Sequence, residues 1–341
     1  MRILVDIGHP AHVHLFKNFA KKMQAKGNDI LFTCREKEFA IDLLKSNKLN
    51  YISLGKHYKS IYGKILGLFK FELKLIKVSL NFKPDVFLSA GSFYAAHVSF
   101  LIRKPHITLE NTENMEQIRL FKPFTKYILT PDAIPQKYGK KQIRYNGFHQ
   151  SAFLHPNYFK KSERIKSDLG IPFNENIFLL RLVALNASHD MNVHGISNDR
   201  LISLVNFLNE KGKLYISSEK PILKDFEQFR LNIPPDRIHD FISICDLVIG
   251  ESSSMSNEAG YLGVPNIFIE DIDLNVLRKY SELGLKIHYK ELNEEKMDEI
   301  KSIVDDLEKV KNTFKKKSED YIKNSIDLTE YIISIVESKL N

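Results

Sequence analysis

Short apolar runs alternate with longer segments of helical periodicity along nearly the whole chain. Strands that alternate with helices in this way are typical of a parallel sheet with crossover helices. The pattern therefore predicts an α/β fold, and it occurs twice. Strands are expected at 3–7, 29–34, 51–54, 86–89, 106–108, 127–130 and 143–145, and again at 177–181, 213–217, 247–250 and 266–269; the expected helices include 13–26, 36–46, 199–211, 223–229, 240–245 and 328–340.

The chain of 341 residues is longer than a usual single domain. A basic, turn-rich segment at 155–164 separates the two sets of strands and predicts a domain boundary. We expect one Rossmann-like domain at 1–160 and a second at 161–341, whose last helix can pack back on the first domain. Open α/β sheets bind ligands at the carboxyl ends of their strands, so two doubly wound domains that face a central cleft would place their sites there.

The charge balance indicates an anionic partner. Fifty Lys and Arg residues against 42 Asp and Glu residues give a net charge of +8. The chain has no dense arginine-rich run and no aromatic–basic RNA motif, so nucleic acid is not an expected partner.

Two cysteines and the N-terminal segment predict a location. Cys34 and Cys245 each lie in or beside an apolar stretch, which is typical of buried free thiols in a reducing cytoplasm. The chain opens directly on a strand pattern without the features of a signal peptide, and no apolar run approaches the length of a membrane span. We expect a cytoplasmic protein that can lie at the inner face of the cell membrane.

The segment 248–265 has the pattern of a strand, a small-residue turn and a helix. Gly250 and the serines Ser252, Ser253 and Ser254 let a backbone approach an anion, and the new helix directs the positive end of its dipole at the turn. Glu258, one turn inside, can accept hydrogen bonds from the two hydroxyls of a ribose. The segment therefore predicts a nucleotide site, while ordinary helix capping by serine is the alternative.

Polar residues also follow the strands of the first half. His9 and His12 come after the first strand, Gly91 and Ser92 after the strand at 86–89, and Glu110 after the strand at 106–108. A histidine titrating near neutral pH can act as a general base, and His12 is the preferred candidate. No carboxylate or cysteine cluster lies near these histidines, so neither a metal nor another cofactor is expected. Helix capping is the alternative for Ser92 and Glu110.

In the second half, Arg181 follows a strand and can neutralise a phosphate bidentately, a surface ion pair being the alternative. Glu219 follows the next strand. Ile238 and His239 precede the serine turn. These loops would converge at one edge of a sheet.

The segment 56–83 is strongly basic and rich in Phe, Leu and Ile. This composition suits a helix that lies on anionic lipid, and a peripheral membrane contact would fit a lipid-linked acceptor. The alternative is a crossover helix whose lysines point into water.

The ordered motifs at 6–14, 181, 186–190, 217–219, 235–239, 250–259 and 262–265 resemble a prokaryotic family, domain of unknown function 354, over nearly the whole chain. That family is similar to glycosyltransferases of the GT-B fold. More distantly, the chain resembles MurG-type N-acetylglucosaminyl transferases and UDP-N-acetylglucosamine 2-epimerases, which share the glutamate of the loop–helix motif.

The resemblance implies roles for single residues. Glu258 would hold the ribose, Ser252–Ser254 and the backbone of Met255 the phosphates, and Ile238 with His239 the border of the base. His189, in the motif at 186–190, joins this donor set with Gly91, Ser92, Arg181 and Glu219, and His12 lies on the acceptor side. Serines replace the diglycine of the UDP-binding relatives at 252–253, and paired serines also resemble the motif of CMP-sialic-acid-using transferases. A CMP-sugar therefore stays open beside a UDP-sugar.

We expect a metal-independent glycosyltransferase of surface polysaccharide or glycoconjugate synthesis. The domain at 1–160 would bind a glycan or lipid-linked acceptor and the domain at 161–341 a nucleotide-sugar donor, with His12, His9, Glu110 and Arg181 at the reacting groups. A 2-epimerase is one alternative, although the Arg-Pro-Glu pattern of epimerases is missing after the first strand. A non-catalytic nucleotide-sugar-binding protein is the other, because the sequence shows no indispensable nucleophile.

Overall fold

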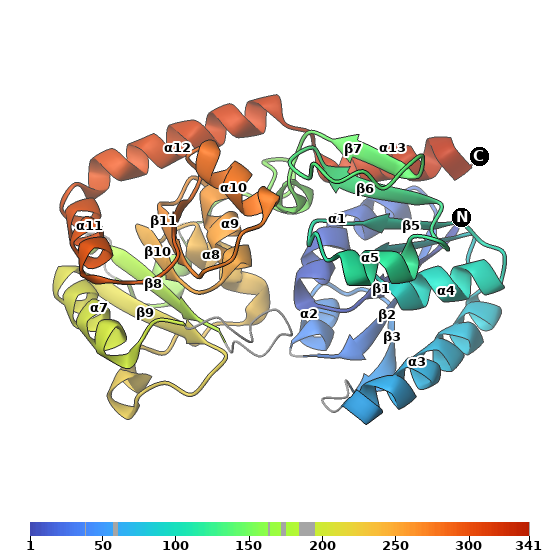
Figure 1. Ribbon diagram of the computed structural model, residues 1–341, viewed down its shortest axis with the longest axis horizontal. Helices are drawn as coiled ribbons and strands as arrows, with labels where there is room; N and C mark the ends of the chain where they lie inside the picture. Colours follow the sequence, from blue (N-terminus) through green and yellow to red (C-terminus); the bar gives the residue numbers. More distant parts are fainter. Residues whose placement is uncertain (38, 57–60, 163, 172–174, 184–194, 341) are drawn as a thin grey trace. The chain divides into compact units, whose positions relative to one another are not determined.

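The computed structural model describes residues 1–340 except 38, 57–60, 163, 172–174 and 184–194. The chain divides into two units, Met1–Tyr158 with Ser325–Asn341, and Phe159–Asn324. Each unit contains a parallel sheet with helices on both faces (Figure 1). The α/β class predicted from the alternating pattern is confirmed.

The sheet of the first unit has the strand order β3-β2-β1-β4-β5-β6-β7, and all its pairs are parallel. The chain builds outward from β1 to β3 and then crosses back to place β4 beside β1. This reversal is the switch point of a doubly wound sheet. The strands are β1 (Arg2–Ile7), β2 (Asp29–Glu36), β3 (Tyr51–Lys56), β4 (Val86–Ala90), β5 (His106–Leu109), β6 (Tyr127–Pro131) and β7 (Gln142–Tyr145).

The same reversal sorts the helices of the first unit into two layers (Figure 1). Right-handed crossovers put the helices that follow β1 and β2 on one face and those that follow β3, β4 and β5 on the other. One layer holds α1 (Pro10–Ala25), α2 (Ala40–Ser46), the short η1 (His149–Ala152) and α13 (Leu328–Leu340); the other holds α3 (Ile61–Phe82), α4 (Phe93–Leu101) and α5 (Met115–Phe121).

The C-terminal helix α13 packs on α1 within the first unit. Lys22 pairs with Glu330, and Lys26 Nζ lies 2.8 Å from Glu337 Oε1. Thr329 Oγ1, which is buried, donates to the carbonyl oxygen of Ala152 at 2.9 Å. The buried apolar side of α13 supplies the main attachment, because exposed ion pairs contribute little.

The sheet of the second unit has the order β12-β11-β10-β8-β9, and it too is parallel throughout. Its strands are β8 (Ile177–Leu182), β9 (Lys213–Ser218), β10 (Leu247–Gly250), β11 (Asn266–Ile269) and β12 (Ile287–Tyr289). The helices are α6 (Arg164–Asp168), α7 (Asn198–Lys211), η2 (Lys224–Phe229), η3 (Pro235–Arg237), α8 (Ile238–Ile242), α9 (Ser253–Tyr261), α10 (Asn275–Glu282), α11 (Glu294–Asp305) and α12 (Leu307–Asn324).

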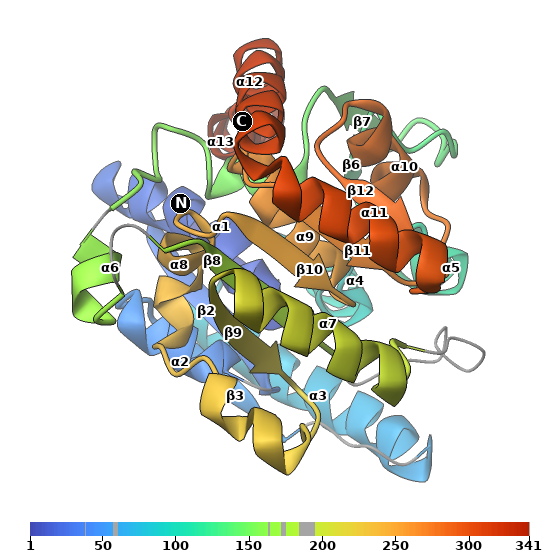
Figure 2. The ribbon, with the colours of Figure 1, turned by 90° about the vertical axis from the view of Figure 1, so that its left-hand side faces the viewer.

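Alternate residues of the β8 strand face opposite layers of the second unit. Phe178 and Leu180 join the core under α7 and α11, whereas Ile177 and Leu179 join the core under α8 and α9. Figure 2 shows α7 and α11 together on one side of these strands. A strand that is buried on both faces has consecutive apolar residues. The apolar runs at 177–180 and 247–249 are therefore recognisable in the sequence as β8 and β10.

Four elements of the second unit differ from the sequence expectation. The helix expected at 240–245 begins and ends earlier, at Ile238–Ile242, and the segment near 223–229 is a 3-10 helix. The strand β12 and the helix α10 were not predicted. A three-residue edge strand is too short to show a period, so its pairing with β11 decides its conformation.

Both cysteines are free and buried, as predicted, and burial raises the pKa of the Cys34 thiol to about 11. Among the helices of the described ranges, none combines the length and apolar character needed to span a bilayer.

Candidate functional site

The turn between β10 and α9 begins at a glycine that packing requires. Gly250 has a φ of +149°, and a Cβ atom there would overlap the carbonyl oxygen of Arg181 on the neighbouring strand β8. A side chain at this position would force two paired strands apart. The close approach of the two backbones therefore fixes where the turn to α9 begins.

The first turn of α9 carries the three serines predicted to bind phosphate. Ser252 is the N-cap, and its Oγ accepts a hydrogen bond from Met255 N at 3.4 Å and lies 3.2 Å from Ser254 Oγ. Ser253 is half-buried and Ser254 is exposed. The turn thus uses Met255 N–H to cap its own helix, and the positive end of the helix dipole lies at the carboxyl edge of the sheet.

Glu258 lies one turn further along α9 and contacts His239 of α8. Glu258 Oε2 is 3.4 Å from His239 Nε2, and both side chains are largely buried. Ile238 packs against the apolar cluster under α8 and α9. The structure therefore brings together the predicted ribose carboxylate and one of the two residues predicted to border a base.

Arg181 and Glu219 pair with each other. Arg181 Nη1 donates to Ser217 Oγ at 2.8 Å, and Nη2 contacts the Glu219 carboxylate. The Arg181 side chain is 13% exposed and that of Glu219 is 34% exposed, so the pair lies at the boundary between the domain interior and solvent. The buried Nε of Arg181 has no hydrogen-bond partner within the described ranges. An anion that binds here would share the guanidinium with Glu219 and could use Nε.

Glu251 is a buried carboxylate that sequence analysis did not select. Its side chain accepts hydrogen bonds from Val183 N at 3.0 Å and Ile196 N at 2.9 Å, and Lys220 Nζ lies 3.1 Å away. One carboxylate therefore joins Val183 and Ile196 beside the β10–α9 turn. His189, predicted to bind the donor, lies outside the described residues.

Replacing Glu251 with Gln is expected to lower the free energy of unfolding by about 2 kcal/mol, because Lys220 loses its partner and one backbone N–H loses a charged acceptor. Hydrogen exchange at the amides of Val183 and Ile196 should accelerate because their shared acceptor is weakened. Urea unfolding with exchange mass spectrometry measures both.

Glu294→Gln is the matched control, because Glu294 is 84 % exposed in its pair with Arg200. We expect a loss under about 0.5 kcal/mol. Equal losses in the two variants would mean that the Glu251 contacts contribute no more than a surface pair.

In the first unit, a buried ionic network lies at the carboxyl ends of β1 and β2. Asp6 is fully buried and accepts hydrogen bonds from Thr33 Oγ1 at 2.8 Å, Arg35 Nη1 at 3.1 Å and Ser92 Oγ at 2.5 Å. The Arg35 guanidinium also lies 4.9 Å above the ring of Tyr94. The network ties the predicted residue Ser92, which is the N-cap of α4, to three residues that sequence analysis missed.

Gly91 and Glu110 lie side by side at the ends of β4 and β5. Gly91 has a φ of +66°, and a Cβ atom there would lie 3.4 Å from Glu110 Oε2. Glu110 Oε1 accepts hydrogen bonds from Thr112 N and Oγ1 at 2.6 Å and from Glu113 N at 3.1 Å. Burial raises the pKa of Glu110 despite these hydrogen bonds. One oxygen therefore holds the turn, and the other faces the glycine.

The two predicted histidines differ in role. His9 is the N-cap of α1, where its Nδ1 accepts a hydrogen bond from Ala11 N at 3.2 Å. His12 Nδ1 lies 3.4 Å from Gly8 N. Burial and the charges of neighbouring residues lower the pKa of His12 well below its ordinary value, so its imidazole is neutral at pH 7. With Nδ1 as acceptor the proton is on Nε2, and His12 then donates a hydrogen bond.

His149 of η1 interacts with His12, whose pKa a protonated His149 would lower, and sequence analysis missed it. Burial lowers the pKa of His149 to about 3. Its buried Nε2 has no hydrogen-bond partner in the described part of the chain. The only sequence signal was a histidine shortly after the last strand of the first half.

Across the described ranges, no three His, Cys, Asp or Glu side chains are grouped as they would be around a metal ion. The described residues of the two sheet edges include buried carboxyls, imidazoles, guanidinium groups and a helix N-terminus.

Two Rossmann-like units, each with polar residues at the carboxyl edge of a parallel sheet, define a fold of the GT-B class. The chain belongs to the family DUF354, described as a protein of unknown function, whose model matches residues 1–334. A relative from Methanocaldococcus jannaschii, the uncharacterized protein MJ0665, is 22% identical over 305 residues, which are 86% of this chain and 89% of the relative.

Solved structures share the fold at low sequence identity. UDP-GlcNAc 2-epimerase from Neisseria meningitidis bound to UDP-GlcNAc has a TM-score of 0.69 at 14% identity over 95% of this chain and 99% of that one. MnaA of S. aureus with UDP has a TM-score of 0.70 at 14% identity over 100% and 97%. The spinosyn rhamnosyltransferase SpnG with thymidine diphosphate has 0.62 at 14% identity over 100% of both chains. These neighbours establish the GT-B fold.

Proposed function

We propose that this protein is a glycosyltransferase that moves a sugar from a nucleotide-sugar donor to a glycan or lipid-linked acceptor. The observation that carries the proposal is the β10–α9 turn. There Gly250 lies close to the backbone of Arg181, Ser252 caps the helix and Glu258 contacts His239. The neighbours that carry UDP, UDP-GlcNAc or thymidine diphosphate support a nucleotide as the ligand of such a fold.

In this proposal the second unit binds the donor. The N-terminus of α9, with Ser252, Ser253 and Ser254, faces the phosphates, and Glu258 accepts hydrogen bonds from the ribose. Arg181 shares its guanidinium between Glu219 and the leaving phosphate. The helix dipole and this guanidinium would stabilise the negative charge on the departing nucleotide without a divalent metal.

The first unit would supply the acceptor side. Glu110 is the proposed general base, because burial raises its pKa and one of its oxygens is not used in the turn. His12 would donate a hydrogen bond to an oxygen of the acceptor or sugar, and His9 would hold the turn that positions it. The acceptor oxygen gives its proton to Glu110 and attacks the anomeric carbon, and the nucleotide leaves with the bonding electrons.

Sugar epimerisation is the second candidate function. It is favoured by the buried Glu110 carboxyl, whose raised pKa suits proton exchange, and by the fold shared with 2-epimerases. Epimerisation changes the configuration of the sugar, whereas transfer to an acceptor releases the free nucleotide. NMR of the sugar after incubation with a UDP-sugar alone detects epimerisation, and release of free nucleotide that requires an added acceptor detects transfer. Binding with neither change, with and without an acceptor, indicates a non-catalytic binding protein.

The donor site is tested by thermal unfolding with UDP, CMP, GDP and dTDP. We expect one nucleotide to raise the Tm by about 3 °C near 100 times its Kd, which corresponds to roughly 2.7 kcal/mol of binding linkage. The Glu258→Ala variant should lose the shift because the ribose hydroxyls lose their acceptor.

Two further variants keep this test informative. Glu282→Ala removes an exposed carboxylate of the same unit and should keep the full shift. Glu258→Gln retains the side-chain volume beside His239, so the variant should keep the Tm of the wild type without nucleotide. A smaller nucleotide-induced rise in its Tm would then show a loss of binding and not a loss of folding. Absence of a shift for all four nucleotides in the wild type would remove the main support for a donor site.

A further inference from the structure

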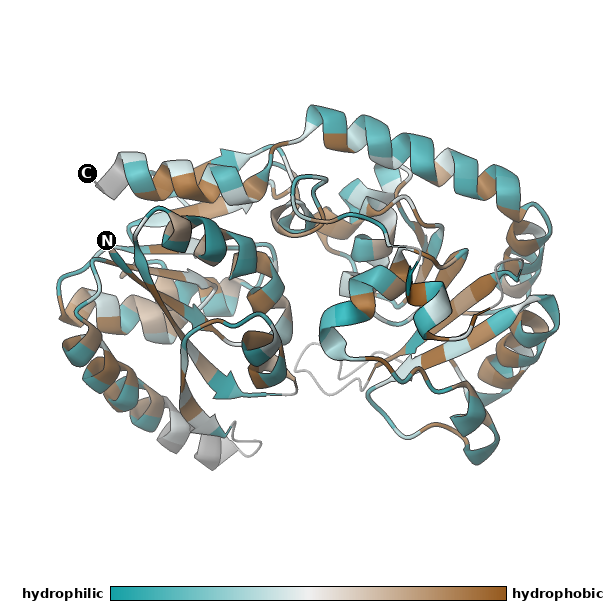
Figure 3. Cartoon of the chain, turned by 180° about the vertical axis from the view of Figure 1, so that it is seen from behind, coloured by the Kyte–Doolittle hydropathy of each residue, from teal (hydrophilic) through white to brown (hydrophobic). Residues whose placement is uncertain are grey.

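The layer formed by α3 and α4 exposes apolar side chains to solvent. Five large apolar side chains in the described part of the chain are more than half exposed, and all of them lie on these two helices: Phe69, Leu73, Leu80, Phe100 and Leu101. On α3 they recur at helical spacing, and the hydropathy colouring shows brown and teal alternating along this helix (Figure 3). Exposed apolar side chains gathered on two neighbouring helices are typical of an interaction site.

The two helices lie side by side, so their solvent-facing sides form one surface (Figure 1). The ring of Phe71 on α3 lies 5.8 Å from that of Tyr94 on α4. Glu72 Oε1 lies 2.6 Å from His97 Nδ1, also across this pair. These contacts pack the facing sides of α3 and α4 against each other, and the outer sides of both helices remain in solvent.

Positive charge surrounds the exposed apolar residues. Lys70 and Lys77 are exposed on α3, and Arg103 and Lys104 are exposed directly after α4. Glu72, the only acidic residue in the sequence of α3 and α4, is engaged by His97. The surface therefore combines apolar side chains with an excess of cations.

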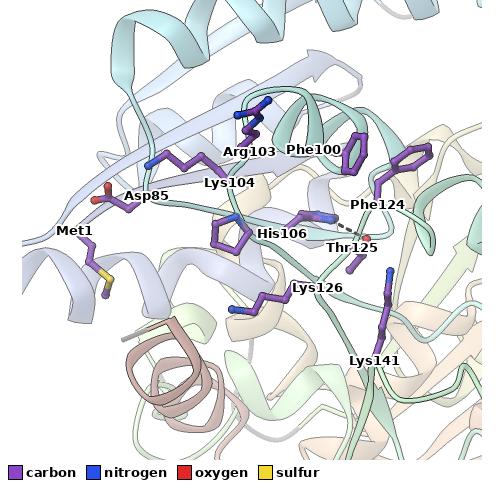
Figure 4. A pocket seen from close by; sticks show the side chains of 11 residues that line it. Met1, Asp85, Phe100, Arg103, Lys104, His106, Phe124, Thr125, Lys126 and Lys141 are labelled. Atoms are coloured by element: carbon purple, nitrogen blue, oxygen red, sulfur yellow. Dashed lines mark hydrogen bonds between the residues drawn. The ribbon is translucent and has the colours of Figure 1, made fainter.

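A basic hollow of about 980 Å³ adjoins this surface at the amino-terminal ends of β4, β5 and β6 (Figure 4). Phe100 and Phe124 form one wall, with ring centroids 5.2 Å apart. The cationic residues that line it are Arg103, Lys104, Lys126 and Lys141.

Two contacts organise the hollow. Lys141 Nζ is held by the carbonyl oxygens of Lys122 and Pro123, at 2.9 and 2.8 Å. Asp85, the acidic residue of the lining, accepts a hydrogen bond from Arg2 N at 2.8 Å. Phe100 belongs to both the hollow and the apolar surface. The hollow lies at the opposite edge of the sheet from Asp6, Gly91 and Glu110, so it is separate from the candidate site.

We propose that the α3–α4 surface docks on a bilayer that contains anionic phospholipid. Phe69, Leu73, Phe100 and Leu101 enter the boundary between headgroups and acyl chains, and the lysines remain among the headgroups. The hollow beside Phe100 takes the phosphate of one anionic headgroup. This inference does not depend on the proposed transferase activity.

Charge favours a lipid surface over a second copy of the chain. An isologous dimer through this surface would bring the cations of both copies, Lys70 and Lys77 among them, into one interface. The repulsion would oppose that contact, whereas an anionic bilayer attracts every cation on the surface.

Vesicle flotation tests the proposal with the full chain. We expect it to float with phosphatidylcholine vesicles that contain phosphatidylglycerol and to remain unbound with phosphatidylcholine alone. Phe100→Ser with Leu101→Ser should lower the bound fraction about tenfold by removing inserted groups. Arg103→Gln with Lys104→Gln should lower it about threefold or more, and added salt should weaken the wild type.

Matched variants on the second unit serve as controls. Ile202→Ser and Leu223→Ser remove exposed apolar groups, and Lys315→Gln with Lys316→Gln removes the same charge as the arginine–lysine pair. All controls should float like the wild type, and circular dichroism verifies folding of each variant. Equal binding to neutral vesicles, equal losses in the controls, no binding to either vesicle, or a dimer that Leu73→Ser dissociates would each overturn the proposal.

Discussion

Gly250→Ala is expected to lower the free energy of unfolding by about 4 kcal/mol or more. The added Cβ would overlap the carbonyl oxygen of Arg181 and would lie 2.7 Å from its carbonyl carbon. Both obstacles are backbone atoms of a paired strand, so no side-chain rotation relieves them. The φ of +149° adds strain for any residue with a side chain. Urea unfolding measures the loss.

Gly139→Ala separates the backbone strain from the overlap. Gly139 also has a positive φ, of +82°, but no heavy atom would lie within 4 Å of an added Cβ. We expect a loss of only about 1 kcal/mol there. If the two variants lost the same stability, the strand contact at Gly250 would not be the cause.

Lys286→Met is expected to stabilise the protein at pH 7 by about 4 kcal/mol. Lys286 is 3% exposed, and its Nζ has no hydrogen-bond partner in the described part of the structure. The Nζ lies 4.8 Å from the ring centroid of Phe268 and 5.4 Å from that of Tyr280. Burial lowers the pKa of Lys286 from 10.5 to about 7, against the opposing effect of Glu270.

The direction of the pH dependence follows from this lowered pKa. Above pH 10.5 the amine is neutral in both states, and the buried lysine costs no ionisation energy. Between pH 10.5 and 7 the unfolded chain binds a proton that the folded chain does not bind, so the wild type loses stability as the pH falls. Below pH 7 both states are protonated, and this contribution no longer changes.

The difference between Lys286→Met and the wild type should therefore be large at pH 7 and should shrink toward zero near pH 10.5. Lys290→Met is the control, because Lys290 is 79% exposed and contacts Asp271 at the surface. Its effect should stay within about 0.5 kcal/mol at either pH. A stability difference for Lys286→Met that did not vary with pH would rule out the lowered pKa as its source.

Individual elements show why the sheets could be predicted and some edges could not. The β1, β8 and β10 strands are buried on both faces, and each contains a short apolar run in the sequence, at 3–5, 177–180 and 247–249. The β12 strand has three residues and exists through its pairing with β11. A strand can be recognised from the sequence only where burial requires several consecutive or alternating apolar residues.

The candidate site divides in a similar way. Glu258 and Arg181 were identifiable because Arg181 follows a recognisable strand and Glu258 lies in a recognisable helix. His239 was named only through the family resemblance of the segment at 235–239. Glu251 was not, because its partners Val183 and Ile196 have no distinctive side chains and contribute only backbone N–H groups. A hydrogen bond to a backbone leaves no pattern of residue types in the sequence.

The sequence by itself determined the alternation of strands and helices, the two parallel sheets and the glycine and serines at the β10–α9 turn, because burial, backbone conformation and capping each require particular residue types. Only the tertiary structure decided that Asp6 meets Arg35 and Ser92, that Arg181 pairs with Glu219 and that Lys286 is buried. These contacts join residues far apart in the chain. Their energies depend on distance and exclusion of water, which no local pattern of residues specifies.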